Sequence, residues 1–285
     1  MSALRAVLPP SAVLLVDQEG GRVARLRPPH WDAHPAAGDI GALFDEEPPA
    51  GLRAAWLTGA LIGLECRDAG FDVACAPVLD RRMPGAATVI GDRSYGHDPA
   101  AVIQLAGAMA SGLLAAGVQP VGKHVPGHGL AQVDSHLALP VVDDRDLAAD
   151  LLAFAASTGL PWMMTAHILY PAWDARWPAT LSRAIIQGIV RGRLGFDGVL
   201  VSDDLAMNAL DGDPASRATA CLAAGCDVAL YCPGDAEGTI GVLHAVPALT
   251  DAAVARLAAA ATLARTRRLA LDGGALRAER STILS

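Results

Sequence analysis

The segment with the most side chains suited to acid-base chemistry is residues 122–129, GKHVPGHG, followed by Asp134, Ser135 and His136. In Asp134-x-His136 the carboxylate can hold one imidazole nitrogen and leave the other to move a proton near neutral pH. The same spacing also fits an Asx-turn with a histidine at the surface. The glycines let the backbone of this segment approach a ligand.

A second segment, residues 198–205 with the sequence GVLVSDDL, places two carboxylates where an apolar run ends. A carboxylate at the end of a buried strand is held rigidly and is partly desolvated, as a nucleophile or general base should be. The plainer interpretation is that both acids cap the next helix. We expect one of Asp203 and Asp204 to cap and the other to be free for chemistry.

Charged groups suited to binding a hydroxyl-rich ligand occur in three further places. Asp17 and Arg25 flank a Gly-Gly turn in DQEGGRVAR, Arg93 lies in GDRSYG, and Lys123 and His124 are adjacent. Guanidinium groups bind oxygen ligands in a bidentate manner, and lysine adds a point charge. These segments together predict a polar binding site.

Six short apolar runs must position these residues. Continuous apolar runs of this length are typical of strands buried on both faces, and the segments between them are long enough for crossover helices. The predicted strands are 12–17, 71–80, 118–124, 161–167, 198–204 and 226–232, and the predicted helices are 49–69, 98–116, 143–158, 180–194 and 214–225.

Five of these runs end in a polar residue: Asp17, Asp80, His124, His167 and Asp203. In a parallel α/β barrel the carboxyl ends of the strands share one face, and active sites are built there. A single aspartate at a strand end is most simply a cap or turn residue, but five together favour a site. No linker divides the chain, so we expect residues 1–285 to form one barrel domain.

Composition excludes several classes of protein. The hydrophobic fraction of 52% supplies a core, and the net charge of -8 disfavours a nucleic-acid-binding surface. No apolar run approaches the roughly 18 residues of a membrane span, so we expect no membrane partner. The arginines at 265, 267 and 268 are expected to form a solvated helix face.

Cysteine and histidine spacing argues against disulfides and metal. The five cysteines include no C-x-x-C pair, which indicates buried small hydrophobic residues in a reducing cytoplasm. A competing hypothesis is a metal-dependent barrel hydrolase. Its ligands would be His124, His128, His136, His167 and Asp203, with Lys123 as a further candidate. The sequence has no H-x-H strand end and no H-E-x-x-H helix, so we expect neither a metal nor a cofactor.

The motifs DQEGGRVARL, APVLD, GDRSYG, GKHVPGHG with DSH, and GFDGVLVSDDLAM resemble those of the glycoside hydrolase family 3 β-N-acetylglucosaminidases. These are cytoplasmic enzymes of peptidoglycan recycling. The similarity runs in the same order from about residue 12 to about residue 233.

The resemblance implies an α/β fold of the (β/α)8 TIM-barrel type that releases non-reducing terminal β-linked N-acetylglucosamine with retention of configuration. It implies that Asp203 is the nucleophile and that His136, paired with Asp134, is the acid/base. It also implies that Asp17, Arg25, Arg93, Lys123 and His124 bind the sugar. The expected substrate is a muropeptide-type glycan, and the expected state is a monomer if the barrel is complete.

Only six of the eight strand-helix units of the family barrel can be counted, and they resemble its third to eighth. Because a βα unit needs roughly 30 residues, we expect the reading frame to begin upstream of Met1 with on the order of 50 further residues. Six strands alone should leave edge strands unpaired and an apolar interior exposed. The alternative to an active enzyme is therefore an inactive truncated product or non-catalytic remnant.

Overall fold

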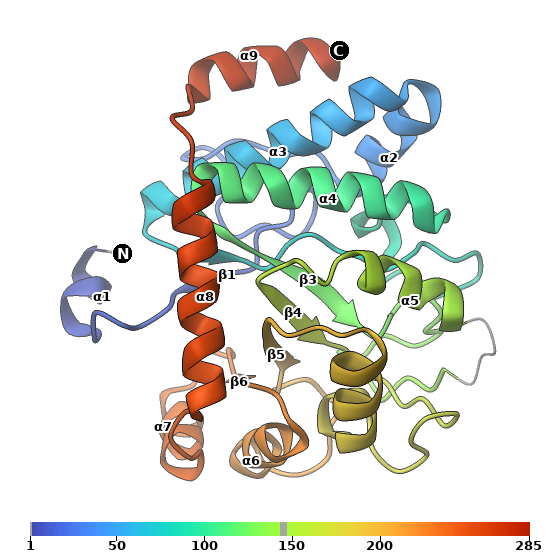
Figure 1. Cartoon of the computed structure of the whole chain (residues 1–285), viewed down its shortest axis with the longest axis vertical. Coiled ribbons are helices and arrows are strands. Elements are labelled where there is room, and N and C mark those ends of the chain that lie inside the picture. Colours follow the sequence, from blue (N-terminus) through green and yellow to red (C-terminus); the bar gives the residue numbers. More distant parts are fainter. Residues whose placement is uncertain (1, 143–146) are drawn as a thin grey trace.

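The centre of the fold is a parallel sheet of six strands in the order β1-β2-β3-β4-β5-β6. The structure is a computed structural model that describes residues 2–142 and 147–285. Each strand coincides with one of the six predicted runs, and only β3 extends beyond its run, by one residue to Val125. These predictions and the α/β fold class are therefore confirmed (Figure 1). The strands are β1 (Leu15–Val16), β2 (Val73–Ala74), β3 (Gln119–Val125), β4 (Trp162–Thr165), β5 (Val199–Asp204) and β6 (Val228–Leu230).

Helices connect successive strands, as the parallel arrangement requires. Local chemistry sets their ends: Asp98 caps α4 by accepting a hydrogen bond from the N–H of Ala100, and Gly117 ends that helix with φ 86°. The predicted connecting helices are confirmed as α3 (Pro48–Ala69), α4 (Pro99–Ala116), α5 (Leu147–Ala156), η2 (Ala179–Leu181) with η3 (Ala184–Arg193), and α6 (Pro214–Ala224). The start of the helix expected over 143–158 falls on residues 143–146, which lie outside the described residues.

Five more α-helices and the short 3-10 helix η1 (Gly91–Arg93) complete the described chain. The α-helices are α1 (Ser2–Val7), α2 (Ala37–Glu46), α7 (Ala236–Ala245), α8 (Asp251–Arg267) and α9 (Gly273–Ile283). The sequence patterns indicated a helix at residues 265–268, where α8 ends, but they did not predict α2, α7 or α9. Helix α9 packs on α3, where Arg53 makes two hydrogen bonds of 2.7 and 2.8 Å to Glu279. Tertiary contacts of this kind, rather than a local apolar pattern, stabilise α9.

Side chains alternate between the two faces of the strands. On one face, Ala74, Met163 and Leu200 pack with the surrounding helices in the largest hydrophobic cluster. On the other, Val73, Trp162 and other side chains form an inner layer. The inner layer consists of Val73, Cys75, Val121, Trp162, Met164, Val199, Val201 and Ala260, with Val13, Leu15, Val228, Leu230 and Leu257 packed against it.

Helix α8 covers the amino-terminal ends of the strands and contributes Leu257 and Ala260 to the inner layer. Its Arg256 binds Asp197 at 2.8 Å and Asp227 at 3.0 Å, just before β5 and β6. Figure 1 shows α8 running across this end of the sheet. Among the described residues β1 and β6 are the outer strands of the sheet, but the expected exposed interior is covered by α8 at this end.

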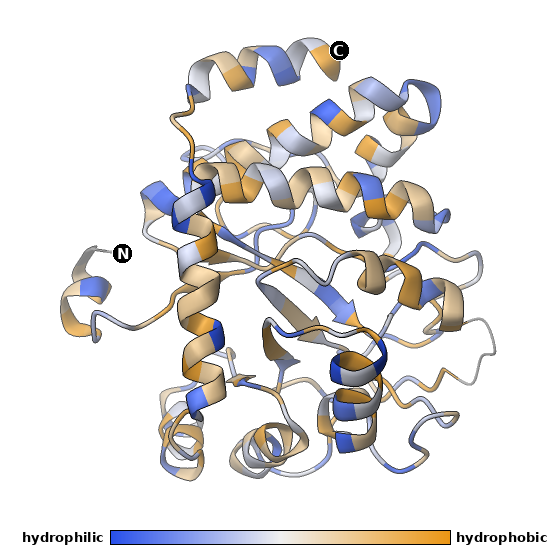
Figure 2. Ribbon diagram, viewed as in Figure 1, coloured by the Kyte–Doolittle hydropathy of each residue, from blue (hydrophilic) through white to orange (hydrophobic). Residues whose placement is uncertain are grey.

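The expectation that no apolar run is long enough to span a membrane is wrong. Helix α4 has the length and composition of a membrane-spanning helix, and most of its ribbon is coloured as hydrophobic or intermediate in Figure 2. In the fold, 56% of this stretch is buried, and α4 packs closely on α3. Gly59 of α3 and Gly112 of α4 allow this approach, because a Cβ on Gly59 would lie 2.1 Å from the carbonyl oxygen of Met109. The core helix of a globular domain meets the same criterion.

Candidate active site

The polar residues predicted at the strand ends gather on the side of the sheet opposite α8. Asp17 follows β1, Lys123 and His124 lie near the end of β3, and Asp203 lies near the end of β5. Two contacts link different strands: Lys123 Nζ lies 2.7 Å from Asp17 Oδ1, and His124 Nδ1 lies 2.6 Å from Asp80 Oδ2. The carboxyl end of β3 is hydrophilic in Figure 2, as expected for the functional end of a parallel barrel sheet.

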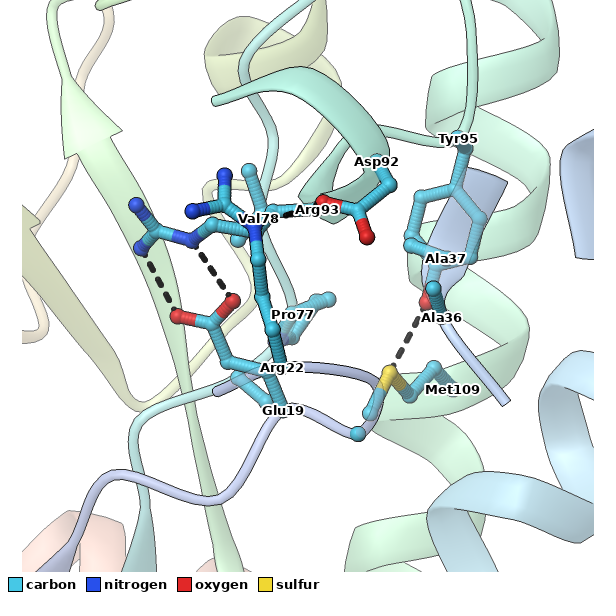
Figure 3. Close-up of a pocket in the computed structure, with 12 residues that line it drawn as sticks. Glu19, Arg22, Ala36, Ala37, Pro77, Val78, Asp92, Arg93, Tyr95 and Met109 are labelled. Atoms are coloured by element: carbon cyan, nitrogen blue, oxygen red, sulfur yellow. Dashed lines mark hydrogen bonds and ion pairs between the residues drawn. The ribbon is translucent and has the colours of Figure 1, made fainter. Parts of the chain in front are cut away.

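A compact ion cluster lies beside β1 and β3. Lys123 is buried, and its ammonium group contacts both Asp17 and, at 2.5 Å, Glu19 Oε1. Glu19 also accepts hydrogen bonds from Nε and Nη2 of Arg93, at 2.9 and 2.8 Å. Figure 3 shows this carboxylate facing the two guanidinium nitrogens. The pair is bidentate, so it fixes the orientation of Arg93 as well as its position.

Charges in this cluster stabilise one another. Burial opposes ionisation of Asp17, but the attraction and hydrogen bond of Lys123 outweigh it and lower the pKa of Asp17 below 3.8. Burial likewise opposes protonation of Lys123, yet its two carboxylate partners raise the pKa of its ammonium group. Arg25 is less engaged, since it is 3.5 Å from Asp17 and its side chain is 62% exposed.

A small cavity adjoins this cluster (Figure 3). Its volume of about 10 Å³ has room for about one water molecule. On one side of the cavity Arg22 donates to Asp92 at 2.7 Å, and on another the Tyr95 hydroxyl contacts the sulfur of Met109 at 2.8 Å. The cavity is too small for a sugar, so it belongs to the supporting structure of the ion cluster.

His124 is buried and its imidazole is held by Asp80. Burial and the nearby cations Arg93 and Lys123 lower the pKa of His124 well below 6.5. Asp80 also accepts hydrogen bonds from the backbone N–H of His124, at 3.1 Å, and of His128, at 2.6 Å. When Nδ1–H of the neutral imidazole donates to Asp80, Nε2 is an acceptor, which lies 3.4 Å from Nη2 of Arg93 and could accept from a ligand hydroxyl. Asp80 thus sets the orientation of the ring.

The two adjacent acids after β5 differ in their contacts. Asp204 Oδ1 accepts hydrogen bonds from the N–H of Ala206 at 3.0 Å and of Cys232 at 3.2 Å, so Asp204 holds the following loop. Asp203 accepts a hydrogen bond from the N–H of Asp204 at 2.8 Å. Burial opposes its ionisation, but His124, His167, this N–H and Lys123 together lower the pKa of Asp203. Asp203 is therefore an ionised, rigidly placed carboxylate.

His136 lies on an exposed loop and is paired with Asp134. Asp134 Oδ1 accepts from the backbone N–H of His136 at 2.9 Å and lies 2.8 Å from its Nδ1. The Asp-x-His spacing was interpreted either as an Asx-turn or as a carboxylate that holds the imidazole. The structure shows both, because one carboxylate oxygen forms the turn and contacts the ring. The His136 side chain is 62% exposed, and its Nε2 makes no hydrogen bond among the described residues.

Glu19 was not singled out in the sequence, whereas Asp80 and His167 were counted among the strand-end residues that favour a site but were given no part in sugar binding. Glu19 joins Arg93 to Lys123, and Asp80 orients His124. His167 contacts Thr180 at 2.7 Å and the carbonyl oxygen of Asp204 at 3.0 Å. For Glu19 the signal was its place two residues after Asp17, which puts both carboxylates at the same strand end.

The competing metal ligand set does not come together. Within residues 2–142 and 147–285, no group of three histidine, cysteine or acidic side chains is arranged to hold a metal ion. Both ring nitrogens of His167 are engaged, and His128 Nε2 lies 3.0 Å from Ser135 Oγ. The cysteines are free thiols, four of them buried and Cys232 exposed.

Comparison with known families identifies residues 3–267 as matching the Glycosyl hydrolase family 3 N terminal domain. A β-hexosaminidase of Methylococcus capsulatus is 42% identical over 98% of this chain and 80% of its own length. One of Bordetella avium is 41% identical over 84% of this chain and 70% of its own. Alignments with several such curated relatives span from 62% to 80% of the relatives' length.

Solved structures resemble the whole described fold. The structure of NagZ from Neisseria gonorrhoeae in complex with N-trifluoroacetyl-D-glucosamine has a TM-score of 0.86 and 31% identity, covering 100% of this chain and 85% of that one. A glycoside hydrolase family 3 β-N-acetylglucosaminidase from a Paenibacillus species has a TM-score of 0.82 and 31% identity, covering 99% and 57% of the two chains.

Proposed function

The chain belongs to glycosyl hydrolase family 3 as an enzyme of the β-hexosaminidase type, and on this premise we propose that it removes non-reducing terminal β-linked N-acetylglucosamine with retention of configuration. The observation that carries the proposal is a pair of groups. Asp203 is an ionised carboxylate fixed at a strand end, and His136 is an accessible imidazole oriented by Asp134. Retaining hydrolysis needs one nucleophile and one proton donor of this kind.

In the first step a carboxylate oxygen of Asp203 attacks the anomeric carbon, and the bond from that carbon to the leaving oxygen breaks. His136 Nε2 gives its proton to the leaving oxygen. In the second step the same nitrogen takes a proton from water, the water oxygen bonds to the anomeric carbon, and the bond to Asp203 breaks. Because Asp134 holds Nδ1, the proton is exchanged at Nε2 throughout.

The ion cluster is proposed as the sugar-binding part of the site. Asp17, Arg25, Arg93, Lys123 and His124 supply donors and acceptors for hydroxyl groups at the carboxyl ends of β1 and β3. Glu19 and Asp80 fix the orientation of Arg93 and His124 before a ligand arrives. The N-trifluoroacetyl-D-glucosamine bound by the Neisseria gonorrhoeae relative supports an N-acylated glucosamine as the ligand class.

We further propose a muropeptide-type substrate, a cytoplasmic location and a reaction that needs no metal or cofactor. The described free thiols are compatible with a reducing compartment. We also propose that the enzyme acts as a monomer.

The decisive experiment traps the covalent intermediate. A fluorinated aryl N-acetylglucosaminide that slows the second step should add one sugar mass to the peptide containing Asp203. Asp203→Ala should lower kcat on an ordinary aryl glycoside by at least about 10³-fold, and added azide should restore turnover as the glycosyl azide. Asp211→Ala, an exposed acid eight residues away, is the matched control. Labelling of another residue, or an active Asp203→Ala enzyme, would refute the proposal.

A further inference from the structure

Asn208 connects the loop that follows Asp203 with the loop that carries His136. Its Nδ2 donates a hydrogen bond to the backbone carbonyl oxygen of His136 at 3.0 Å, across 72 residues of sequence. Asn208 is exposed and lies five residues after Asp203. Neither the motifs nor the family match gives a function to this contact.

The loop on the Asn208 side is firmly held. Arg217 donates to the carbonyl oxygens of Leu205 at 2.7 Å, of Met207 at 3.2 Å and of Leu210. The N–H of Leu205 donates to the carbonyl of Leu230 in β6 at 2.8 Å. Met207 and Leu210 are buried on either side of Asn208. The backbone that carries the Asn208 side chain is therefore held in place by the loop's own contacts.

The loop on the His136 side has fewer outside contacts. Most of its hydrogen bonds are local to the turn. Asp134 Oδ1 binds the backbone N–H and Nδ1 of His136, and the N–H of Leu137 donates to the carbonyl oxygen of Asp134. Leu137 is 73% exposed. Ser135 contacts His128, which lies at the base of the same loop. Among the described residues, the Asn208 bond is the one that ties His136 itself to a different strand-end loop.

We propose that Asn208 is a positioning residue that holds the His136 peptide, and with it the imidazole, at a set distance from the Asp203 carboxylate. This inference rests on the proposed function, in which those two groups act on opposite sides of one glycosidic bond. A single neutral hydrogen bond contributes about 1 kcal/mol net, so the contact can hold the loop and still release it. Loop residues gain catalytic accuracy when a rigid neighbour fixes them.

The kinetic test compares Asn208→Asp and Asn208→Ala with the parent enzyme. Aspartate has the same shape but no donor, and its charge repels the His136 carbonyl. On N,N′-diacetylchitobiose, whose leaving group must be protonated, we expect kcat/KM to fall about tenfold. On a 2,4-dinitrophenyl glycoside, whose leaving group needs no proton, we expect a change below about twofold. His136→Ala should show the same pattern with a larger loss on the disaccharide.

A merely structural role would lower both activities together, and that result would overturn the proposal. Unchanged activity of both variants on the disaccharide would overturn it as well. Gln104→Glu is the matched control, because it changes an exposed carboxamide on α4 in the same way and should leave both activities unchanged.

A direct measurement of the bond uses the fact that Asn208 is the only asparagine in the sequence. In protein labelled with ¹⁵N-asparagine, the side-chain amide gives one pair of signals, and we expect slowed hydrogen exchange for them. Exchange as fast as in a free peptide would overturn the proposal. Failure here, with Asp203→Ala and His136→Ala behaving as proposed, refutes only the Asn208 contact, whereas an active Asp203→Ala enzyme refutes the function itself.

Discussion

Arg93 and Lys123 share one carboxylate, that of Glu19, at the carboxyl end of the sheet. Each cation also has a backbone or side-chain partner of its own, the carbonyl of Val89 for Arg93 and Asp17 for Lys123. Removing Glu19 would leave two buried cations with one fewer anion, and breaking a buried pair costs about 3–5 kcal/mol. At this scale the site depends as much on the residues that orient the ligand-binding groups as on those groups.

Histidines buried near the site make stability depend on pH. Burial is the largest of the effects that lower the pKa of His124, His128 and His167 below 6.5. Below pH 6.5 the unfolded chain therefore binds protons that the folded chain does not, and the free energy of unfolding falls as the pH falls. The raised pKa of Asp80 acts in the opposite sense above pH 3.8 and offsets part of this loss.

We predict that His128→Gln will reduce this pH dependence. Each such histidine contributes at most about 1.4 kcal/mol per pH unit, so between pH 7 and pH 5 the variant should lose less stability than the parent, by about 1 kcal/mol. Urea unfolding at the two pH values measures the difference. Ser135→Ala is the control, because it removes the hydrogen-bond partner of His128 but keeps the titrating ring. Equal pH dependence in parent and His128→Gln would contradict the prediction.

The close packing of helices α3 and α4 limits which residues each helix can have at the contact. Glycine at 59 and 112 brings the two backbones together, since a Cβ on Gly112 would lie 2.2 Å from the carbonyl oxygen of Trp56. Gly107, also on α4, is exposed, and a Cβ there would meet no atom within 4 Å. The same residue type therefore has opposite roles at two positions of one helix.

We predict that Gly59→Ala will lower the free energy of unfolding by about 1–3 kcal/mol, because overpacking forces the helices apart. Gly107→Ala should raise it by about 0.5–1 kcal/mol, because alanine favours the helix and no neighbour is displaced. Urea denaturation of both variants measures the two changes. A Gly59→Ala protein as stable as Gly107→Ala would show that the α3–α4 contact is looser than described.

Prediction from sequence succeeded for elements whose burial is encoded locally and failed for those that depend on distant partners. The strands are apolar on both faces, so a continuous run and its polar end located each of them. Helix α9 depends on Arg53 of α3 and on Arg280, which contacts the buried His34 at 2.6 Å. No local pattern reports such contacts. The contacts of Glu19 with Arg93 and of Asn208 with His136 were not predicted for the same reason, since the partners are far apart in sequence.

Over the whole molecule, the two ends of the sheet have different functions. The carboxyl ends carry the ionised and hydrogen-bonded residues of the site, and α8 covers the amino ends. Val73, Val121, Trp162 and Val199 near the amino ends form one hydrophobic layer with Ala260 of α8. The helix is anchored by Arg256 and by a hydrogen bond from the N–H of Leu269 to the carbonyl of Ala115 at 2.8 Å. The inner layer is thus completed by a helix that follows all six strands in sequence.

We predict that a charge introduced on the inner side of α8 will destabilise the whole domain. Ala260 is 3% exposed within the inner layer, and an unpaired aspartate there would cost several kcal/mol. Ala260→Asp should therefore lower the melting temperature by more than about 10 °C, since 1 kcal/mol corresponds to roughly 2–4 °C in a domain of this size. The loss of near-UV circular dichroism from the aromatic side chains, which include the buried Trp162, should coincide with the loss of activity. Ala259→Asp changes the adjacent, exposed position and should melt as the parent does. If both variants melted alike, α8 would not be packed on the inner layer, and the strands would need another element to cover their amino-terminal ends.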